Sequence, residues 1–100
     1  MYYNKTHREN GQVECEYYFL NDKRHRTDGP AVIYYLNGQV SSERYFLNDE
    51  YHRTDGPAVI YYDGKGKIWN KEWHLNSNRY TETKYNSLVK TMHTSLSYDI

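Results

Sequence analysis

The chain has 100 residues, and 13 Lys and Arg side chains are balanced by 13 Asp and Glu, so the formal net charge is zero. This length allows one small domain, and the charge balance argues against a general binder of nucleic-acid backbones, which needs a basic excess. No apolar run approaches the roughly 18 residues of a membrane span, so we expect no membrane partner. The single cysteine, Cys15, excludes an internal disulfide framework.

The apolar composition is dominated by aromatic residues, with 13 Tyr and 2 Trp in the chain. Tyr and Trp favour strands and half-exposed surfaces, so we expect a thin aromatic core in a mainly β fold. The first residues, Met-Tyr-Tyr-Asn-Lys-Thr, lack the apolar segment of a signal peptide. Together with the low cysteine content, this predicts a cytoplasmic location.

A tandem repeat organises the chain, because the segment HRTDGPAVIYY occurs at residues 25–35 and again at 52–62, 27 residues later. A looser third copy follows with a spacing of 28 and lacks the HRTDGPA segment. Repeats of this period are typical of stacked supersecondary units. The repeat sheet is expected over residues 1–80, with units at about 10–36, 37–63 and 64–80.

Turn signals divide each unit into strands. Asn10-Gly11, Asn37-Gly38 and Asp63-Gly64 are dipeptides that favour type I′ hairpins, whereas Asn21-Asp22 and Asn48-Asp49 are weaker turn signals. No segment is long enough for the crossover that parallel strands require. The sequence therefore predicts an antiparallel meander of about six strands joined as stacked β-hairpins.

Alternation along the strands separates two faces of the predicted sheet. One face stays apolar in all three copies, and we expect it to form the buried stripe: Tyr18, Leu20, Tyr45, Leu47, Trp73 and Leu75. The opposite face carries Phe19, Phe46 and His74 at equivalent positions. This second face is less uniform, so we expect it to be partly exposed.

The C-terminal segment, residues 81–100, differs from the repeats. From about Thr81 to Ser95 it lacks Gly and Pro, and its apolar residues fall at helical spacing: Tyr85, Leu88, Val89, Met92 and Leu96. This pattern predicts one amphipathic α-helix. The helix either covers the open end of the sheet or docks on a partner or on a second copy of the chain.

The unit Glu-x-Tyr-x-x-Asn-Asp-x-x-His, followed by a Gly and a Tyr-rich strand, resembles the MORN repeat, above all its bacterial and viral variants with an HR-x-DGPA insert. The resemblance covers about residues 10–80 and is specific at 25–35 and 52–62. It departs from the family where Asn-Asp replaces the usual Asn-Gly, at 21–22 and 48–49. The resemblance implies hairpins stacked in one elongated sheet and a role in protein binding or as a scaffold, with lipid binding also proposed for the family.

The HRTDGP segments, residues 25–30 and 52–57, are expected to form corners that lead into the Tyr-rich strands, and they offer two interpretations. His25, Arg26 and Asp28 recur as His52, Arg53 and Asp55, and paired arginines could grip a phosphate, a carboxylate or an acidic loop. Alternatively, these residues fasten structural corners, and their recurrence in tandem favours this second interpretation. The residues assigned to the corners are Asp28, Gly29, Pro30, Asp55, Gly56 and Pro57.

Catalytic and metal-binding motifs are not evident in the sequence. Nothing has CxxC or HxxxH spacing, Cys15 has no copy in the other units, and Gly64-Lys65-Gly66-Lys67 precedes no helix that could cradle a phosphate. We therefore expect no enzyme, no metal and no cofactor. Single-stranded nucleic acid could stack on the tyrosines and on Trp69 and Trp73, but the first half of the chain has a net negative charge.

Protein binding is the function that the sequence favours, because tyrosine provides a large contact area at a low entropic cost. The candidate contact residues are Arg26, Arg53, His25, His52, Tyr35, Tyr62, Phe19, Phe46 and Trp69. The resemblance to viral repeats suggests a phage-encoded inhibitor of a host enzyme or defence factor, acting in the host cytoplasm. The alternatives are a homodimeric or larger scaffold and a binder of single-stranded nucleic acid.

Overall fold

The computed structural model describes the backbone of residues 2–98 and the side chains of residues 2–92. Ten strands precede one helix: β1 (Tyr2–His7), β2 (Val13–Leu20), β3 (Lys23–Arg24), β4 (Val32–Leu36), β5 (Gln39–Arg44), β6 (Phe46–Leu47), β7 (Glu50–Tyr51), β8 (Val59–Tyr62), β9 (Ile68–Leu75), β10 (Asn78–Tyr80) and α1 (Glu82–Tyr98). The predicted mainly β fold with one C-terminal helix is confirmed.

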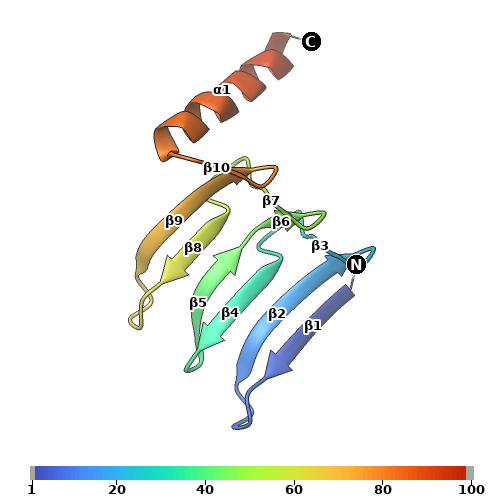
Figure 1. Ribbon diagram of the computed structural model, residues 1–100, viewed down its shortest axis with the longest axis vertical. Helices are drawn as coiled ribbons and strands as arrows, with labels where there is room; N and C mark the ends of the chain where they lie inside the picture. The colour runs from blue at the N-terminus through green and yellow to red at the C-terminus, as the bar shows by residue number, and fades with distance from the viewer. Residues whose placement is uncertain (1, 99–100) are drawn as a thin grey trace.

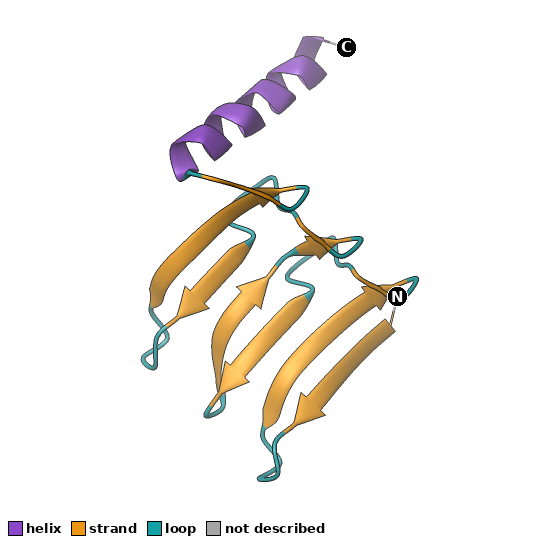
Figure 2. Cartoon of the chain, viewed as in Figure 1, coloured by secondary structure: helices purple, strands orange, loops and turns teal. Residues whose placement is uncertain are grey.

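Three long antiparallel hairpins lie side by side in one sheet, in the strand order β1-β2-β4-β5-β8-β9-β10 (Figures 1 and 2). The hairpins are β1–β2, β4–β5 and β8–β9, and each joins the next through antiparallel pairing. The molecule is elongated, with extents of 54 × 32 × 20 Å. The first hairpin includes β1, which the predicted first unit, residues 10–36, leaves out.

Short hairpins follow the long ones through left-handed turns. Two of these turns, at 21–22 and 48–49, are the predicted weaker turn signals, and the third, at 76–77, was not predicted. Positive φ occurs at both central residues in Asn21-Asp22 (51° and 63°), Asn48-Asp49 (50° and 67°) and Asn76-Ser77 (49° and 66°). Asn and Asp tolerate this region because their short polar side chains bond locally, so these pairs serve as type I′ turns.

Only one of the three predicted type I′ dipeptides has this geometry. Asn37 and Gly38 both have positive φ, at 52° and 79°, and Gly38 takes the conformation without a Cβ penalty. The Asn10-Gly11 and Asp63-Gly64 predictions are wrong, because these loops are longer. The second is closed by Asp63 Oδ1, which accepts from the Lys65 and Lys67 amides at 2.8 and 3.0 Å.

A substitution pair tests the left-handed turns. Asp22→Gly is expected to raise the free energy of unfolding by up to about 1 kcal/mol, because Asn-Gly is the preferred type I′ pair. Asp49→Gly at the equivalent position should lower it, because Asp49 Oδ1 accepts from the Arg24 amide at 2.7 Å and from Arg24 Nε at 2.9 Å. Urea denaturation of both variants checks this; the same sign at both positions would contradict it.

The fully buried side chains lie mainly on the face opposite to the predicted stripe. Cys15, Ala31, Val32 and Phe46 form one apolar cluster, with Phe46 only 2% exposed. Phe46 was expected on a partly exposed face, and that expectation is wrong. The extended strand is interrupted between β5, which ends at Arg44, and β6, which begins at Phe46. The Phe46 ring packs into the space left by the small Cys15 and Ala31 side chains.

The predicted buried stripe is confirmed only at its C-terminal end. Leu75 is buried, but Leu20 is 36% exposed beside its turn, and Tyr18, Tyr45, Leu47 and Trp73 are half-buried. The physical reason is that no second layer covers this face. Instead, the Arg26 and Arg53 guanidinium groups lie 4.0 Å from the ring centroids of Tyr18 and Tyr45.

The first turn of helix α1 anchors it to the last corner. The Lys84 amide donates to Thr81 Oγ1 at 3.2 Å, as at a helix N-cap. The buried Tyr85 hydroxyl donates to the Arg53 carbonyl at 2.5 Å and accepts from the Gly56 amide at 3.2 Å. Beyond this anchor the helix extends past the end of the sheet (Figure 1), and Met92 is 43% exposed. Leu96, also predicted on the apolar face, lies outside the described side chains.

Within residues 2–98, no helix has the length and apolar character needed to cross a bilayer.

Candidate binding surface

The two faces of the sheet differ in how strictly they repeat. We call the side that carries Glu16, Tyr18, Glu43 and Tyr45 the corner face, and the opposite side the groove face. On the corner face the first two units are identical at these positions. On the groove face the equivalent residues diverge, as in the series Tyr17, Arg44 and Glu72 along β2, β5 and β9.

Identity on the corner face has a structural cause, because its polar groups bond between neighbouring units. The Tyr35 hydroxyl donates to the Glu16 carboxylate, and the Tyr62 hydroxyl donates to Glu43 in the same way. Tyr3 adds a second hydrogen bond to Glu16. These bonds hold successive hairpins together, so Tyr35 and Tyr62, expected as partner contacts, act as structural links.

The hydrogen bonds between tyrosine and glutamate predict that the protein loses stability at alkaline pH. Burial, and then the hydrogen bond to Glu43, raises the pKa of Tyr62 from 10.0 to about 12. Because the folded-state pKa lies above the unfolded one, the stabilisation is complete below pH 10 and is lost as pH rises through about 12. We expect the free energy of unfolding to fall across this window and Tyr62→Phe to make the fall shallower. Denaturation at a series of pH values checks this, and an unchanged slope in the variant would contradict it.

The two histidines also link successive units. His25 Nδ1 accepts a hydrogen bond of 3.1 Å from the Asn48 amide, and His52 Nδ1 accepts one of 3.0 Å from the Asn76 amide. Each histidine thereby fixes the left-handed turn of the next unit. The Nδ1 atom of each histidine is therefore engaged within the fold.

The arginines close their own corners. Arg26 donates from Nε to Asp28 at 2.9 Å and from Nη1 to the Pro30 carbonyl at 3.2 Å. Arg53 repeats both bonds, to Asp55 at 2.8 Å and to the Pro57 carbonyl at 3.0 Å. A Cβ at Gly29 or Gly56 would lie 3.0 Å from the guanidinium carbon, which explains why glycine occupies both positions. This geometry favours the structural interpretation of the corners.

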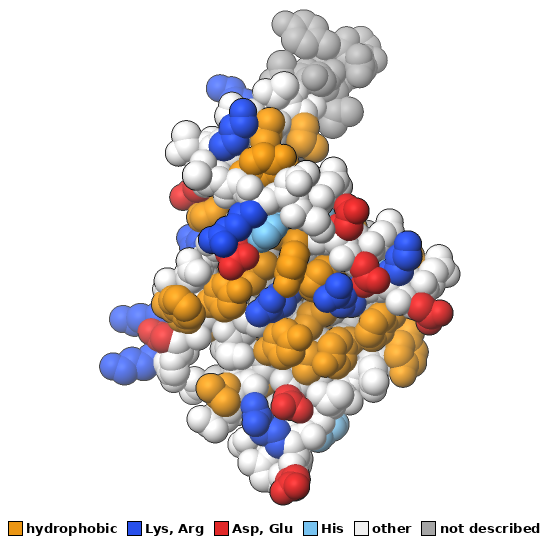
Figure 3. Space-filling view, viewed as in Figure 1, with side chains coloured by type: hydrophobic (Ala, Val, Ile, Leu, Met, Phe, Trp, Pro, Cys, Tyr) orange, Lys and Arg blue, Asp and Glu red, His pale blue; other side chains and the backbone are white. Residues whose placement is uncertain are grey.

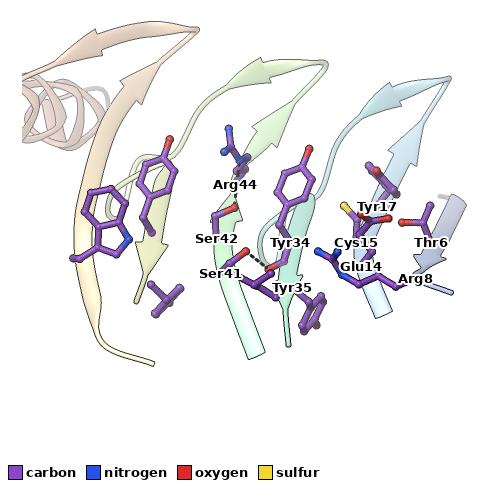
Figure 4. A pocket seen from close by; sticks show the side chains of 14 residues that line it. Thr6, Arg8, Glu14, Cys15, Tyr17, Tyr34, Tyr35, Ser41, Ser42 and Arg44 are labelled. Atoms are coloured by element: carbon purple, nitrogen blue, oxygen red, sulfur yellow. Dashed lines mark hydrogen bonds between the residues drawn. The ribbon is translucent and has the colours of Figure 1, made fainter. Parts of the chain in front are cut away.

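The groove face holds an open groove of about 640 Å³ that crosses the strands (Figure 4). We call it the aromatic groove and define it by five of its lining residues: Tyr17, Tyr34, Arg44, Tyr61 and Trp69. Figure 3 shows hydrophobic side chains gathered in a band across the sheet. Tyr34 is 39% exposed and Trp69 is 64% exposed, so their rings are open to solvent.

Three β-bulges at equivalent repeat positions shape this groove. The pairing register skips one residue in each long hairpin, leaving Glu14, Ser41 and Trp69 without a partner on the adjacent strand. All three side chains line the groove. Bulges redirect side chains and increase local twist. The same irregularity, repeated in each long hairpin, therefore places three different side chains on one surface.

Arg44 lies at the centre of the aromatic groove. Its guanidinium carbon is 5.2 Å from the ring centroid of Tyr34 and 5.6 Å from that of Tyr61. Nη1 donates to the Tyr51 hydroxyl at 2.8 Å, which fixes the orientation of the guanidinium. Among the described residues, no acidic side chain lies within ion-pair distance of Arg44, whereas Arg24, Arg26, Arg53 and Arg79 each have one.

Glu72, the counterpart of Arg44 in the third unit, is engaged by its neighbours. It accepts from the Tyr61 hydroxyl at 3.1 Å and contacts His74 Nε2 at 3.0 Å and Arg79 at 3.9 Å. Burial acts to raise the pKa of Glu72, but the hydrogen bonds with His74 and Tyr61 lower it below its usual value. Its negative charge is thus locally compensated.

The remaining candidate residues are distributed differently from the prediction. Trp69 is exposed at the groove, Phe19 is half-buried beside Tyr17, and Phe46 is unavailable to a partner because it is buried. Tyr34, Arg44 and Tyr61 line the groove but were not among the predicted contact residues. Comparing the units position by position shows only that this position diverges, as Tyr17, Arg44 and Glu72, and does not single out Arg44.

No cluster of three metal-ligating side chains occurs in the described part of the chain. The Cys15 thiol is buried, and this burial raises its pKa, which disfavours the reactive thiolate.

Comparison with known proteins found no match among protein-family models, and no significant match among curated proteins or solved structures.

Proposed function

We propose that this protein is a non-catalytic protein-binding module and that the aromatic groove is its recognition surface. The observation that carries the proposal is the contrast between the faces: side chains on the corner face bond to one another, whereas Tyr34 and Trp69 on the groove face are 39% and 64% exposed. Rigid aromatic side chains around an arginine have the composition of binding hot spots. They lie on strands, so their positions are set by the sheet.

Binding of single-stranded nucleic acid is a weaker candidate for the same surface. Aromatic rings on a sheet can stack bases, but such sites also need a positive path for the phosphates. Arg8 and Arg44 are the two cationic side chains lining the groove, and Glu14 lies on the same lining. A chain with zero net charge and one central cation fits a protein partner better.

A role as an inhibitor of a host or defence enzyme is the more specific form of the proposal. It is supported by the resemblance of its repeats to viral MORN-type repeats. A homo-oligomeric scaffold is the alternative within the same class, and it uses the same exposed rings against a second copy of the chain.

Affinity capture with a matched pair of variants tests the proposal. The groove variant carries Tyr34→Ala and Trp69→Ala, and the control carries Leu20→Ala and Met92→Ala, which remove similarly exposed side chains elsewhere. We expect a protein from the source organism to be retained by the wild type and by the control but not by the groove variant. Equal retention by all three, or retention of nucleic acid alone, would refute the proposal. Solution mass of the wild type separates a monomer from a self-assembling scaffold.

A further inference from the structure

We infer that the aromatic groove recognises a peptide segment of its partner protein that presents an Asp or Glu carboxylate to Arg44. This inference rests on the proposed function and specifies the chemistry of the partner. It starts from Arg44 itself, a half-buried guanidinium among aromatic rings that has no acidic neighbour within the described chain.

A half-buried charge without a counterion is unusual, because removal from water disfavours the charged form unless a partner compensates. The other half-buried arginines follow this rule. Arg24, Arg26 and Arg53 are paired with Asp49, Asp28 and Asp55 at 2.9, 2.9 and 2.8 Å. Arg44 has instead the Tyr51 hydroxyl at 2.8 Å and a long contact of 3.5 Å from Nε to Ser42 Oγ. An incoming carboxylate would supply the missing charge.

The geometry around Arg44 suits a planar anion. Strand β5 lies between β4 and β8, so the rings of Tyr34 and Tyr61 flank the guanidinium, and the Tyr51 hydroxyl holds one of its ends. No hydrogen bond from Nη2 is found within the described residues, so that nitrogen can donate to a ligand. A carboxylate matches the guanidinium fork.

The flanking surface suits the rest of a peptide. Trp69 provides an exposed aromatic surface at one end of the groove. Its ring centroid lies 5.5 Å from that of Tyr61. Glu14, the bulged residue of β2 opposite β1, also lines the groove. A phosphate backbone would pass this carboxylate at a cost, whereas a peptide with a single acidic side chain avoids it.

The test selects ligands from a phage-displayed library of random linear peptides against the wild-type protein. Selected peptides that also bind the Tyr34→Ala, Trp69→Ala variant are discarded, because they bind elsewhere. We expect the remaining peptides to share an Asp or Glu. Replacing that residue by Asn or Gln in a synthetic peptide should weaken binding by about tenfold or more, measured by calorimetry.

A charge exchange completes the test. Arg44→Glu should lose the acidic peptide and gain a peptide carrying Lys at the same position, with circular dichroism confirming that the variant folds. If the variant does not fold, the amide-substituted peptide against the wild type decides. Selected groove-binding peptides without a shared acidic residue, or an amide substitution without effect, would overturn the inference and leave the proposed function standing. If no groove-binding peptide can be selected and the protein binds labelled oligo(dT), both the inference and the proposed function are overturned.

Discussion

Replacing Phe46 by alanine is expected to lower the free energy of unfolding by about 3–5 kcal/mol, the range for buried aromatic side chains. Phe46 is 2% exposed, packs with Cys15 and Val32, and stacks on Tyr51 with ring centroids 4.3 Å apart. The Arg24 guanidinium covers the ring at 4.1 Å. Truncation would therefore leave a cavity beneath an arginine and remove contacts between two units of the sheet.

The repeat supplies a matched control for Phe46, because Phe19 occupies the equivalent position in the first unit. Phe19 is only half-buried, with Tyr2 and Tyr17 at ring-centroid distances of 6.0 and 5.9 Å. We expect Phe19→Ala to cost less than half as much as Phe46→Ala. Chemical denaturation measures both, and equal losses would show that the buried cluster is not centred on Phe46.

Replacing Arg26 and Arg53 together by alanine is expected to lower the free energy of unfolding by about 2–4 kcal/mol. Each arginine contributes a stack on a tyrosine ring and a hydrogen bond to a proline carbonyl, together worth about 1–2 kcal/mol. The ion pairs with Asp28 and Asp55 add little, because these carboxylates are 81% and 83% exposed. The two losses are summed because the arginines share no hydrogen-bond partner.

Two control variants separate this structural role from the effect of charge. Arg79→Ala removes an arginine that is 62% exposed and should change stability by less than about 0.5 kcal/mol. Replacing Arg26 and Arg53 by lysine keeps the charges but loses the planar fork, so it should recover only part of the stability. If the double alanine variant were as stable as the wild type but bound its partner more weakly, the corners would be a binding site and not a structural element.

Much of the architecture could be predicted from the sequence, because the repeat acts through local rules. The identical HRTDGPAVIYY segments at 25–35 and 52–62 predicted equivalent corners and strands, and the structure has them. Helical spacing after Thr81 predicted α1, which begins at Glu82. The turn assignments were less successful, since a type I′ turn depends on the length of the whole loop and not on the dipeptide alone.

The candidate binding surface could be predicted only in part. Trp69 was predicted as a partner contact, but Arg44, Tyr34 and Tyr61 were not assigned to a site. The bulges at Glu14, Ser41 and Trp69 exist only as a mismatch between two paired strands, and no single strand shows them in its own sequence.

The sequence by itself determined the repeat, the antiparallel hairpins and the corners, because these depend on turn residues, strand propensity and spacing along the chain. Only the tertiary structure decided which face is buried and where a surface remains free. Both faces carry tyrosines, so alternation separates the faces without ranking them. Burial depends on what covers each face. Arginine side chains and hydrogen bonds between units cover the corner face. On the groove face, Phe46 covers one end of the strands, and the aromatic groove is open to solvent.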